Sequence, residues 1–173
     1  MDETSYFGVD GYLLDSKTRQ SVPRDQYKCR PRPLPQCLDV LRRATEGTAG
    51  EICDFCLVNY CASGNNNISY HSDDKQFLRS NPAIASFSLG GKGDFALKHK
   101  PVPSSMPGPV TPETMPLKLP LVSGDMILMW GTTQANWLHS VPKRKGEESG
   151  TGRINITLGE ALVRGGTEKL LPI

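Results

Sequence analysis

The chain has 173 residues and a formal net charge of +2, a length that fits one domain with its own core, residues 1–173. A charge so close to zero does not by itself indicate nucleic acid, because nucleic-acid-binding domains are usually strongly basic. No segment approaches the ~18 apolar residues of a membrane span, and the acidic N-terminus lacks the apolar run of a signal peptide. The five cysteines are an odd number, which favours free thiols in a reducing compartment. We therefore expect an intracellular protein, nuclear or cytoplasmic. A monomer is expected as well, although no pattern in the sequence indicates the oligomeric state.

The N-terminal part, residues 5–50, is expected to hold one strand, one loop and one helix. Residues 5–14 indicate a short aromatic strand and turn, and residues 16–33 a polar, basic loop. A helix is predicted from Pro35 to about Thr45, since proline suits the first helical turn and the apolar residues that follow recur at helical spacing. Gly47 and Gly50 are expected to end it.

The remainder, residues 51–160, changes to short β segments separated by Gly, Pro and Asn turns, which is typical of an all-β double sheet. The predicted strands cover residues 51–60, 67–72, 83–89, 93–99, 117–122, 125–130, 137–141 and 152–158. Seven of the 14 prolines fall between Pro101 and Pro120, so that stretch is predicted to be an extended arm or a mobile loop. The fold class is mainly β with a few helices.

Cys53-x-x-Cys56 suggests a metal or redox motif. The surrounding run from Ile52 to Tyr60 is apolar and β-prone, and residues three apart on a strand point to opposite faces. We therefore interpret both cysteines as structural thiols.

The chain contains three histidines, His71, His99 and His139. His71 and Asp73 stand two apart on an expected strand or its extended end, so both face the same side. Two histidines and one carboxylate on one face of an iron leave positions open for a bidentate cosubstrate and oxygen. His139 is the better third ligand because His99 lies between two lysines. An isolated His-x-Asp is also compatible with a surface strand.

The last predicted strand places polar side chains on one face and apolar ones on the other. Arg153, Asn155 and Thr157 share the polar face. This face suits either solvent or a dicarboxylate, which arginine binds through two parallel hydrogen bonds. Asn59 shares its strand face with Cys61 and is predicted to supply an amide to the same ligand.

Together these segments resemble the AlkB dioxygenases, especially the eukaryotic homologues that repair DNA, and most of all their fungal members. The resemblance covers nearly the whole chain and rests on several motifs in the family's order. They are Tyr6-Phe7-Gly8 with Gly11-Tyr12, Asn59-Tyr60-Cys61 with Gly64, His71-Ser72-Asp73-Asp74, the segments 84–90 and 94–100, Leu119-Pro120-Leu121, Gly124-Asp125-Met126, Trp137-Leu138-His139 and Arg153-Ile154-Asn155-Ile156-Thr157.

The resemblance implies a double-stranded β-helix (jelly-roll) fold that uses Fe(II), 2-oxoglutarate and O2. It implies His71, Asp73 and His139 as the catalytic iron ligands. It also implies that Arg153 pairs with the distal carboxylate of 2-oxoglutarate, assisted by Asn59 and Asn155. Cys61 and Thr157 belong to the same expected cosubstrate site.

The implied reaction is oxidative dealkylation of an N-alkylated nucleobase in DNA or RNA, single- or double-stranded. A base in a duplex must be flipped out of the stack to reach the iron. By similarity, Asp74 contacts that base, Tyr70 lies near it, and Tyr6 belongs to the substrate-side strand. Two basic clusters are available for phosphates: Lys28, Arg30 and Arg32, and Lys143, Arg144 and Lys145.

The sequence departs from the family at three positions. Gly159 replaces the last Arg of R-x-N-x-T-x-R, with Arg164 as the alternative source of that cation. Cys61 replaces the Tyr of Asn-x-Tyr, with Tyr60 as the alternative through a local bulge. Gly93 replaces the Arg that many relatives have before Asp-Phe. Losing one charged hydrogen bond costs ~1.5–3 kcal/mol. Two alternatives therefore stay open beside nucleobase dealkylation: a dioxygenase acting on protein or a small molecule, and a weakly active binding module.

Overall fold

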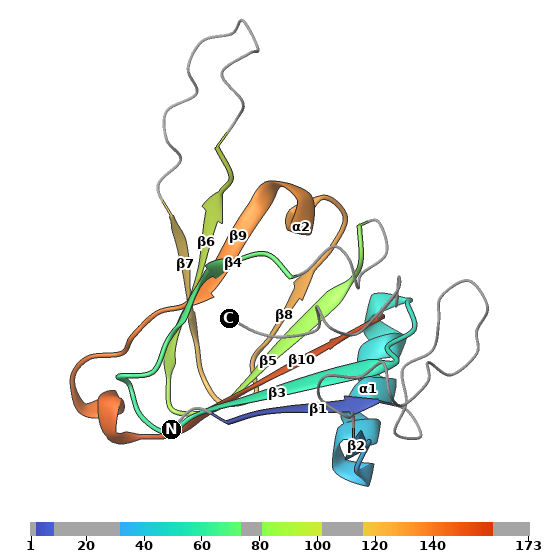
Figure 1. The fold of residues 1–173 in the computed structure, drawn as a ribbon, viewed down its shortest axis with the longest axis horizontal. Helices are drawn as coiled ribbons and strands as arrows, with labels where there is room; N and C mark the ends of the chain where they lie inside the picture. The colour runs from blue at the N-terminus through green and yellow to red at the C-terminus, as the bar shows by residue number, and fades with distance from the viewer. Residues whose placement is uncertain (1–2, 9–31, 74–80, 102–115, 161–173) are drawn as a thin grey trace, which may run out of the picture.

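The structure is a computed structural model, and it describes residues 3–8, 32–73, 81–101 and 116–160. Within these ranges the strands form two sheets: a large sheet in the order β2-β1-β3-β10-β5-β8 and a small sheet in the order β4-β9-β6-β7. The strands are β1 Glu3–Gly8, β2 Arg32–Pro33, β3 Phe55–Cys61, β4 Ile68–His71, β5 Ile84–Gly90, β6 Gly93–His99, β7 Leu117–Leu121, β8 Met126–Met129, β9 Trp137–Val141 and β10 Arg153–Gly159. The expected β double sheet of jelly-roll type is confirmed (Figure 1).

The strand predictions after residue 60 agree with the structure to within one residue or so at each end. The prediction for residues 51–60 starts four residues early, because β3 begins at Phe55. The Cys53 N–H does not join a ladder and instead donates to Glu46 Oε1 at 2.8 Å. Two short helices were not expected: α2, Thr133–Asn136, and the 3-10 helix η3, Glu147–Gly150.

Helix α1 spans Gln36–Ala49, longer than predicted. Gly47 lies inside the helix, so the expectation that it ends there is wrong; the turn around Gly47 is supported by burial of Thr45 and Ala49. Gly50 does end the helix: its φ of +69° is left-handed, and its N–H donates to Glu46 O at 2.9 Å. A left-handed residue after the last turn is where glycine is most favourable.

Two apolar clusters divide the interior. One lies between the sheets and contains residues from both of them: Ile84, Phe95, Leu121, Met129 and Val141. The other lies on the outer face of the large sheet, where Leu38 and Leu41 of α1 pack against residues such as Cys56, Ile156 and Leu158. On β10, therefore, Ile156 and Leu158 face α1, and the alternate residues face the small sheet.

Cys53 and Cys56 lie in the same cluster against α1 and are both buried and free. The two cysteines do not lie on opposite faces of one strand, as was predicted, because Cys53 precedes β3. Burial raises the pKa of Cys53 to about 11 and that of Cys56 to about 12. Protonated, apolar-packed thiols fit the structural role predicted for them.

Some predictions fall outside the described ranges. These are the turn expected beyond Gly8, the loop over most of residues 16–33 and the arm expected within 102–115. In the described part of the chain, no helix is long and apolar enough to cross a membrane. Strand β1 pairs with β3 along its whole length, so the N-terminal segment extends the core sheet; the single domain over 1–173 stays a prediction.

Candidate metal centre

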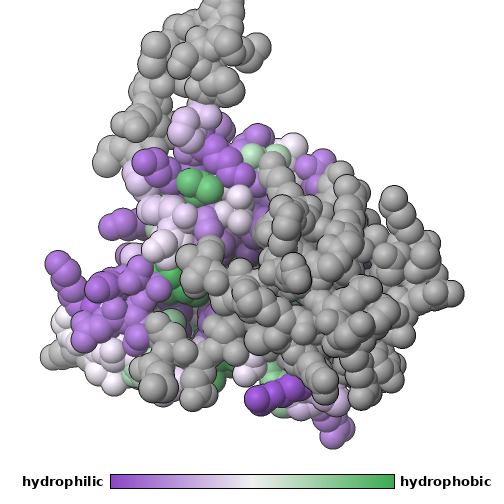
Figure 2. Space-filling model, viewed as in Figure 1, coloured by the Kyte–Doolittle hydropathy of each residue, from purple (hydrophilic) through white to green (hydrophobic). Residues whose placement is uncertain are grey.

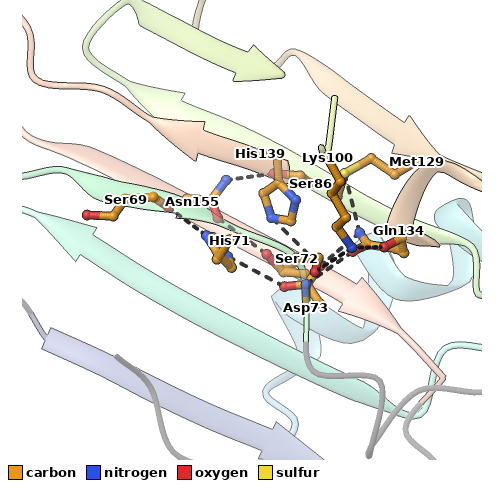
Figure 3. Close-up of polar contacts among 11 residues, drawn as sticks. Ser69, His71, Ser72, Asp73, Ser86, Lys100, Met129, Gln134, His139 and Asn155 are labelled. Atoms are coloured by element: carbon orange, nitrogen blue, oxygen red, sulfur yellow. Dashed lines mark hydrogen bonds and ion pairs between the residues drawn. The ribbon is translucent and has the colours of Figure 1, made fainter. Parts of the chain in front are cut away.

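Neighbouring strands of the small sheet bring together the three predicted metal ligands. His71 is the last residue of β4 and lies directly opposite His139 of β9. Asp73 follows two residues later, with Oδ1 3.7 Å from His71 Nε2 and Oδ2 3.8 Å from His139 Nε2. One ligand atom from each residue lies within 4.8 Å of the others, and Figure 3 shows the side chains converging.

Hydrogen bonding determines which nitrogen of His71 faces the centre. The Nδ1 of His71 lies 2.8 Å from Ser69 O, and a carbonyl oxygen accepts only from an N–H. Nδ1 therefore carries a proton, and Nε2 is the nitrogen that faces Asp73 and is placed to bind a metal. Such an outer hydrogen bond fixes the tautomer and orientation of a metal-binding histidine.

The electrostatics of the group suit a cation. Burial, with smaller effects from His71 and Lys100, lowers the pKa of His139 to about 3, so its imidazole is neutral at pH 7. Burial also raises the pKa of Asp73, opposed by His71 and by a hydrogen bond from Gln134. A bound divalent cation favours the carboxylate form. Two neutral imidazoles and one carboxylate are the donor set of non-haem Fe(II) sites, so the residues fit that metal.

The third histidine lies outside this group, as expected. His99 ends β6, its Nδ1 lies 2.7 Å from Lys100 O, and its ring meets Trp137 edge-on. Among the described residues, the triad is the one set of three potential ligands that meets.

The inner face of the large sheet carries polar side chains of β10 and β5, and this face lies across the double sheet from the triad. Asn155, 6% exposed, donates through Nδ2 to Ser86 Oγ at 2.8 Å and to Phe87 O at 3.1 Å. Thr157 Oγ1 donates to Asn155 Oδ1 at 3.3 Å. Asn155 and Ser86 lie beside the triad in Figure 3. Ser86 was not identified from the sequence as a site residue, because apolar residues predominate in its strand.

Arg153 is the most deeply buried charged residue of this face, at 1% exposure. Its Nη2 donates to Ser88 Oγ at 2.7 Å and its Nη1 to Asp94 O at 3.2 Å. Its Nε has no hydrogen-bond partner among the described residues. The guanidinium also forms no ion pair with any of these residues. Burial lowers its pKa, as does the nearby Arg144. Cys61 and Asp94 oppose this lowering of the pKa only in part. A buried cation that forms no ion pair is costly, so the geometry favours an anionic ligand.

The other predicted cosubstrate residues line the same strands. In the β3–β10 register, Asn59 lies opposite Asn155, and Cys61 lies opposite Arg153. Cys61 is buried. The structure therefore brings all five predicted cosubstrate residues onto adjoining positions of two paired strands.

A second cation near Arg153 was not predicted. A β-carbon built on Gly93 would lie 2.8 Å from Arg144 Cδ and 2.9 Å from Arg153 Nη1. Both arginine side chains thus occupy the space beside Gly93, the position where the family pattern has an arginine. Arg144 belongs to the basic cluster 143–145, but the sequence indicated only phosphate binding for it.

The predicted substrate residues are placed less fully. Tyr6 lies on β1 opposite Leu57. Tyr70 precedes His71 on β4 and is 40% exposed. Asp74 lies outside the described residues.

Two residues beside the triad were also missed by the sequence analysis. Gln134 of α2 hydrogen-bonds to Asp73, and Lys100 donates to Ser72 Oγ at 3.0 Å and to Gln134 O at 2.8 Å. No local pattern marks either residue, because both contacts join segments far apart in the sequence.

Comparisons with known proteins agree with this site. The sequence profile of the 2OG-Fe(II) oxygenase superfamily matches residues 9–158. The chain is 31% identical over 133 residues to the human "DNA oxidative demethylase ALKBH2", covering 77% of this chain and 49% of the relative. It is 34% identical over 128 residues to the rat "Alpha-ketoglutarate-dependent dioxygenase alkB homolog 3", covering 72% and 42%.

The fold also matches a solved structure, "The structure of OsALKBH1", with a TM-score of 0.58 over 92% of this chain and 78% of that one, at 20% identity. The chain spans about half the length of the curated relatives it matches. Members of the matched family use Fe(II), 2-oxoglutarate and O2, and the His-Asp-His group fits the iron. The chain therefore belongs to the 2OG-Fe(II) oxygenase superfamily, as an AlkB-like member.

Proposed function

We propose that this protein is an Fe(II)- and 2-oxoglutarate-dependent dioxygenase that removes alkyl groups from nucleobases in DNA or RNA. The observation that carries the proposal is the pairing of two sites inside one double sheet. The His71–Asp73–His139 group lies on the small sheet, and the buried Arg153, with its unpartnered Nε, lies on the large sheet. A metal and a dicarboxylate are the two components that such a pairing would hold.

In this proposal His71, Asp73 and His139 hold the iron, and Arg153 binds the distal carboxylate of 2-oxoglutarate through two hydrogen bonds. Asn59, Asn155 and Thr157 supply neutral hydrogen-bonding groups around the cosubstrate. Cys61 occupies the position on β3 that pairs with Arg153 of β10. Three protein ligands leave coordination positions for the cosubstrate and oxygen. Burial of this polar face keeps bulk water away from the reacting groups.

The proposed reaction uses both oxygen atoms of O2. One atom of O2 enters succinate as 2-oxoglutarate loses CO2, and the other enters the N-alkyl carbon as a hydroxyl group. For an N-methyl base, the resulting N-hydroxymethyl group loses formaldehyde and leaves the N–H of the repaired base. O2 is the oxidant, and iron held by His71, Asp73 and His139 would activate it. The protein's role is to orient the substrate and exclude water.

Support for a nucleic-acid substrate comes from the names of the relatives and from the surface of the protein. One relative is named a DNA oxidative demethylase. Figure 2 shows hydrophilic residues gathered on the described surface over the loops between β3 and β4 and between β9 and η3. Lys143 and Lys145 of that second loop are exposed and are proposed to contact phosphates. Tyr70, exposed beside His71, is proposed to lie against the flipped base, with Tyr6 and Asp74 nearby.

One observation favours a second candidate. Gly159 gives the inner face no side chain where the family pattern has an arginine. A chain that binds iron but holds 2-oxoglutarate too weakly for turnover would act as a binding module.

The first experiment is an anaerobic titration of the Fe(II)-loaded protein with 2-oxoglutarate, in which the visible charge-transfer band of the chelate is recorded. Arg153→Met should raise the dissociation constant for 2-oxoglutarate roughly ten- to a hundredfold, since a charged hydrogen bond contributes about 1.5–3 kcal/mol. Iron stoichiometry should stay the same. If iron binds and no band forms, the binding-module candidate replaces the enzyme.

The second experiment identifies the substrate. Succinate and formaldehyde are measured with N-methylated single-stranded DNA and RNA oligonucleotides and with the same strands unmethylated. Methyl-dependent turnover at one aldehyde per succinate supports the proposal. A saturating charge-transfer band without methyl-dependent turnover would leave the cosubstrate assignment in place and exclude these nucleic acids as substrates.

A further inference from the structure

We propose that Gln134 is a positioning residue that fixes the rotation of the Asp73 carboxylate, so that Asp73 offers the metal one oxygen atom. The inference rests on the proposed metal ligation by His71, Asp73 and His139. It concerns a residue of α2 that no sequence motif marked.

Gln134 contacts Asp73 at two points. The Asp73 N–H donates to Gln134 Oε1 at 3.1 Å, and Gln134 Nε2 donates to Asp73 Oδ2, also at 3.1 Å. The orientation of the amide is determined by its partners: the reverse arrangement would set N–H against N–H and oxygen against oxygen. Gln134 is 4% exposed, so water does not compete effectively for these two bonds.

The contact matters because the last torsion of an aspartate has no sharp staggered preference. Without an external partner, the Asp73 carboxylate would rotate freely about this bond and present either one or two oxygens to a metal. The Gln134 N–H donates to Oδ2, which lies 3.8 Å from His139 Nε2, and this bond sets the rotation that places Oδ1 3.7 Å from His71 Nε2. Because Oδ2 is engaged by the amide, Oδ1 is the oxygen available to bind a metal. One-oxygen ligation keeps coordination positions open for the cosubstrate and oxygen.

A second tether reinforces the first. Lys100 Nζ bridges Ser72 Oγ and Gln134 O, and Gln134 Nε2 also lies 3.5 Å from Met129 Sδ. Figure 3 shows this network on the Asp73 side of the triad. Helix α2 leads directly into β9, which carries His139. The network therefore holds the segment around Asp73 in a fixed position relative to His139.

The test is Co(II) titration of the folded, metal-free full chain, followed by the ligand-field absorbance bands. Gln134→Met keeps most of the side-chain volume and removes both hydrogen bonds. It should weaken Co(II) binding about 10- to 100-fold, the usual effect of losing an outer hydrogen-bond partner of a ligand, and should change the band positions as the carboxylate rotates. The matched control is Gln36→Met, an exposed position of α1 on the opposite side of the large sheet.

The band positions separate positioning from a merely structural role, because reduced folding lowers band intensity without moving the bands. Unchanged affinity and bands in Gln134→Met would overturn the proposal. If that variant does not fold, Gln134→Asn takes its place: its arm is one methylene too short to span both contacts, and wild-type bands there would likewise overturn the proposal. The titration needs neither 2-oxoglutarate nor nucleic acid, so a failed dealkylation assay leaves this result intact. Failure of the wild type to bind Co(II) would refute the metal site itself.

Discussion

The rings of Phe95 and His139 are stacked, with centroids 5.5 Å apart and planes inclined by only 10°. Phe95, on β6, is 1% exposed and belongs to the apolar cluster between the sheets. His139 lies on the neighbouring strand, so the stack crosses the β6–β9 pair. The apolar core therefore determines the plane of one proposed iron ligand.

Phe95→Leu should loosen His139 while retaining the fold. A hydrophobic exchange of similar size usually costs below about 1.5 kcal/mol, whereas removing the whole ring in Phe95→Ala should cost about 3–5 kcal/mol. Urea unfolding of the metal-free protein measures the stability, and Co(II) titration measures the site. We expect Phe95→Leu to lower metal affinity several-fold. Wild-type affinity in a folded Phe95→Leu protein would show that the stack does not orient the imidazole.

His139→Ala should abolish stoichiometric Fe(II) binding. The neutral imidazole, 3.8 Å from Asp73 Oδ2, is one of three proposed ligands. Mutation of a residue that only hydrogen-bonds to a ligand lowers metal affinity roughly 10- to 100-fold, so removal of a ligand itself should lower it further. Metal content after anaerobic loading and desalting is the measurement. His99→Ala is the matched control because His99 lies outside the triad. Full iron content and turnover in His139→Ala would refute the third ligand.

Gly159→Arg should strengthen 2-oxoglutarate binding. A β-carbon at Gly159 would lie 3.5 Å from both Ala83 O and Phe55 Cε1, an ordinary packing distance, so the strand accepts a side chain there. A charged hydrogen bond adds about 1.5–3 kcal/mol, equivalent to a roughly ten- to hundredfold lower dissociation constant. Gly159→Met provides a long uncharged side chain for comparison. An unchanged KM for 2-oxoglutarate in the arginine variant would show that the missing cation does not limit binding.

Cys53 and Cys56 should resist alkylation at pH 8, whereas Cys37 should react readily. The folded pKa values of about 11 and about 12 keep the two buried thiols protonated, and the reactive form is the thiolate. Cys37 is exposed on α1. Peptide mapping after brief iodoacetamide treatment gives the order of modification. Early labelling of Cys56 would contradict its burial.

The same pKa shifts predict a loss of stability in alkali. An unfolded thiol ionises near pH 8.5, so between that pH and about 11 the folded state retains protons that the unfolded state has lost. Stability must then fall as pH rises. Urea midpoints at pH 7 and pH 10 measure the fall, which should be smaller in Cys56→Ala than in the wild type.

Strand positions were accessible from the sequence because they depend on local alternation and turn residues. The errors arose where a contact outside the segment itself changes the local preference. Glu46 accepts a hydrogen bond from the Cys53 N–H, seven residues on, and β3 starts later. Gly47 remains helical because the burial of Thr45 and Ala49 and the ion pair of Arg42 with Glu46, at 2.7 Å, support the same turn. The Arg42–Glu46 pair has the i,i+4 spacing that a sequence can indicate, whereas the Glu46–Cys53 contact depends on the tertiary fold.

The residues of the site also fall into two groups, those that a local pattern indicates and those that only the tertiary fold brings together. His71 and Asp73 stand two apart, and the polar face of β10 alternates along one strand, so both were visible locally. Gln134 meets Asp73 from 61 positions away, and Arg144 reaches Gly93 from a loop after β9. Such contacts follow from which strands pair and how the sheets pack, and local sequence patterns do not reveal either. His139 was preferred to His99 because His99 lies between two lysines, and the family resemblance then implied the same residue as the third ligand.

Strand β4 lies at the edge of the small sheet, pairs with β9 alone in the described sheet, and has an irregular register between Ile68 and His71. In the metal-free protein, such an edge should open locally at a lower free energy than the centre of the sheet. A cation held by β4 and β9 would close a long chain loop and act as a removable cross-link. Metal supply would then govern not only turnover but also how readily proteases and exchanging solvent reach this edge.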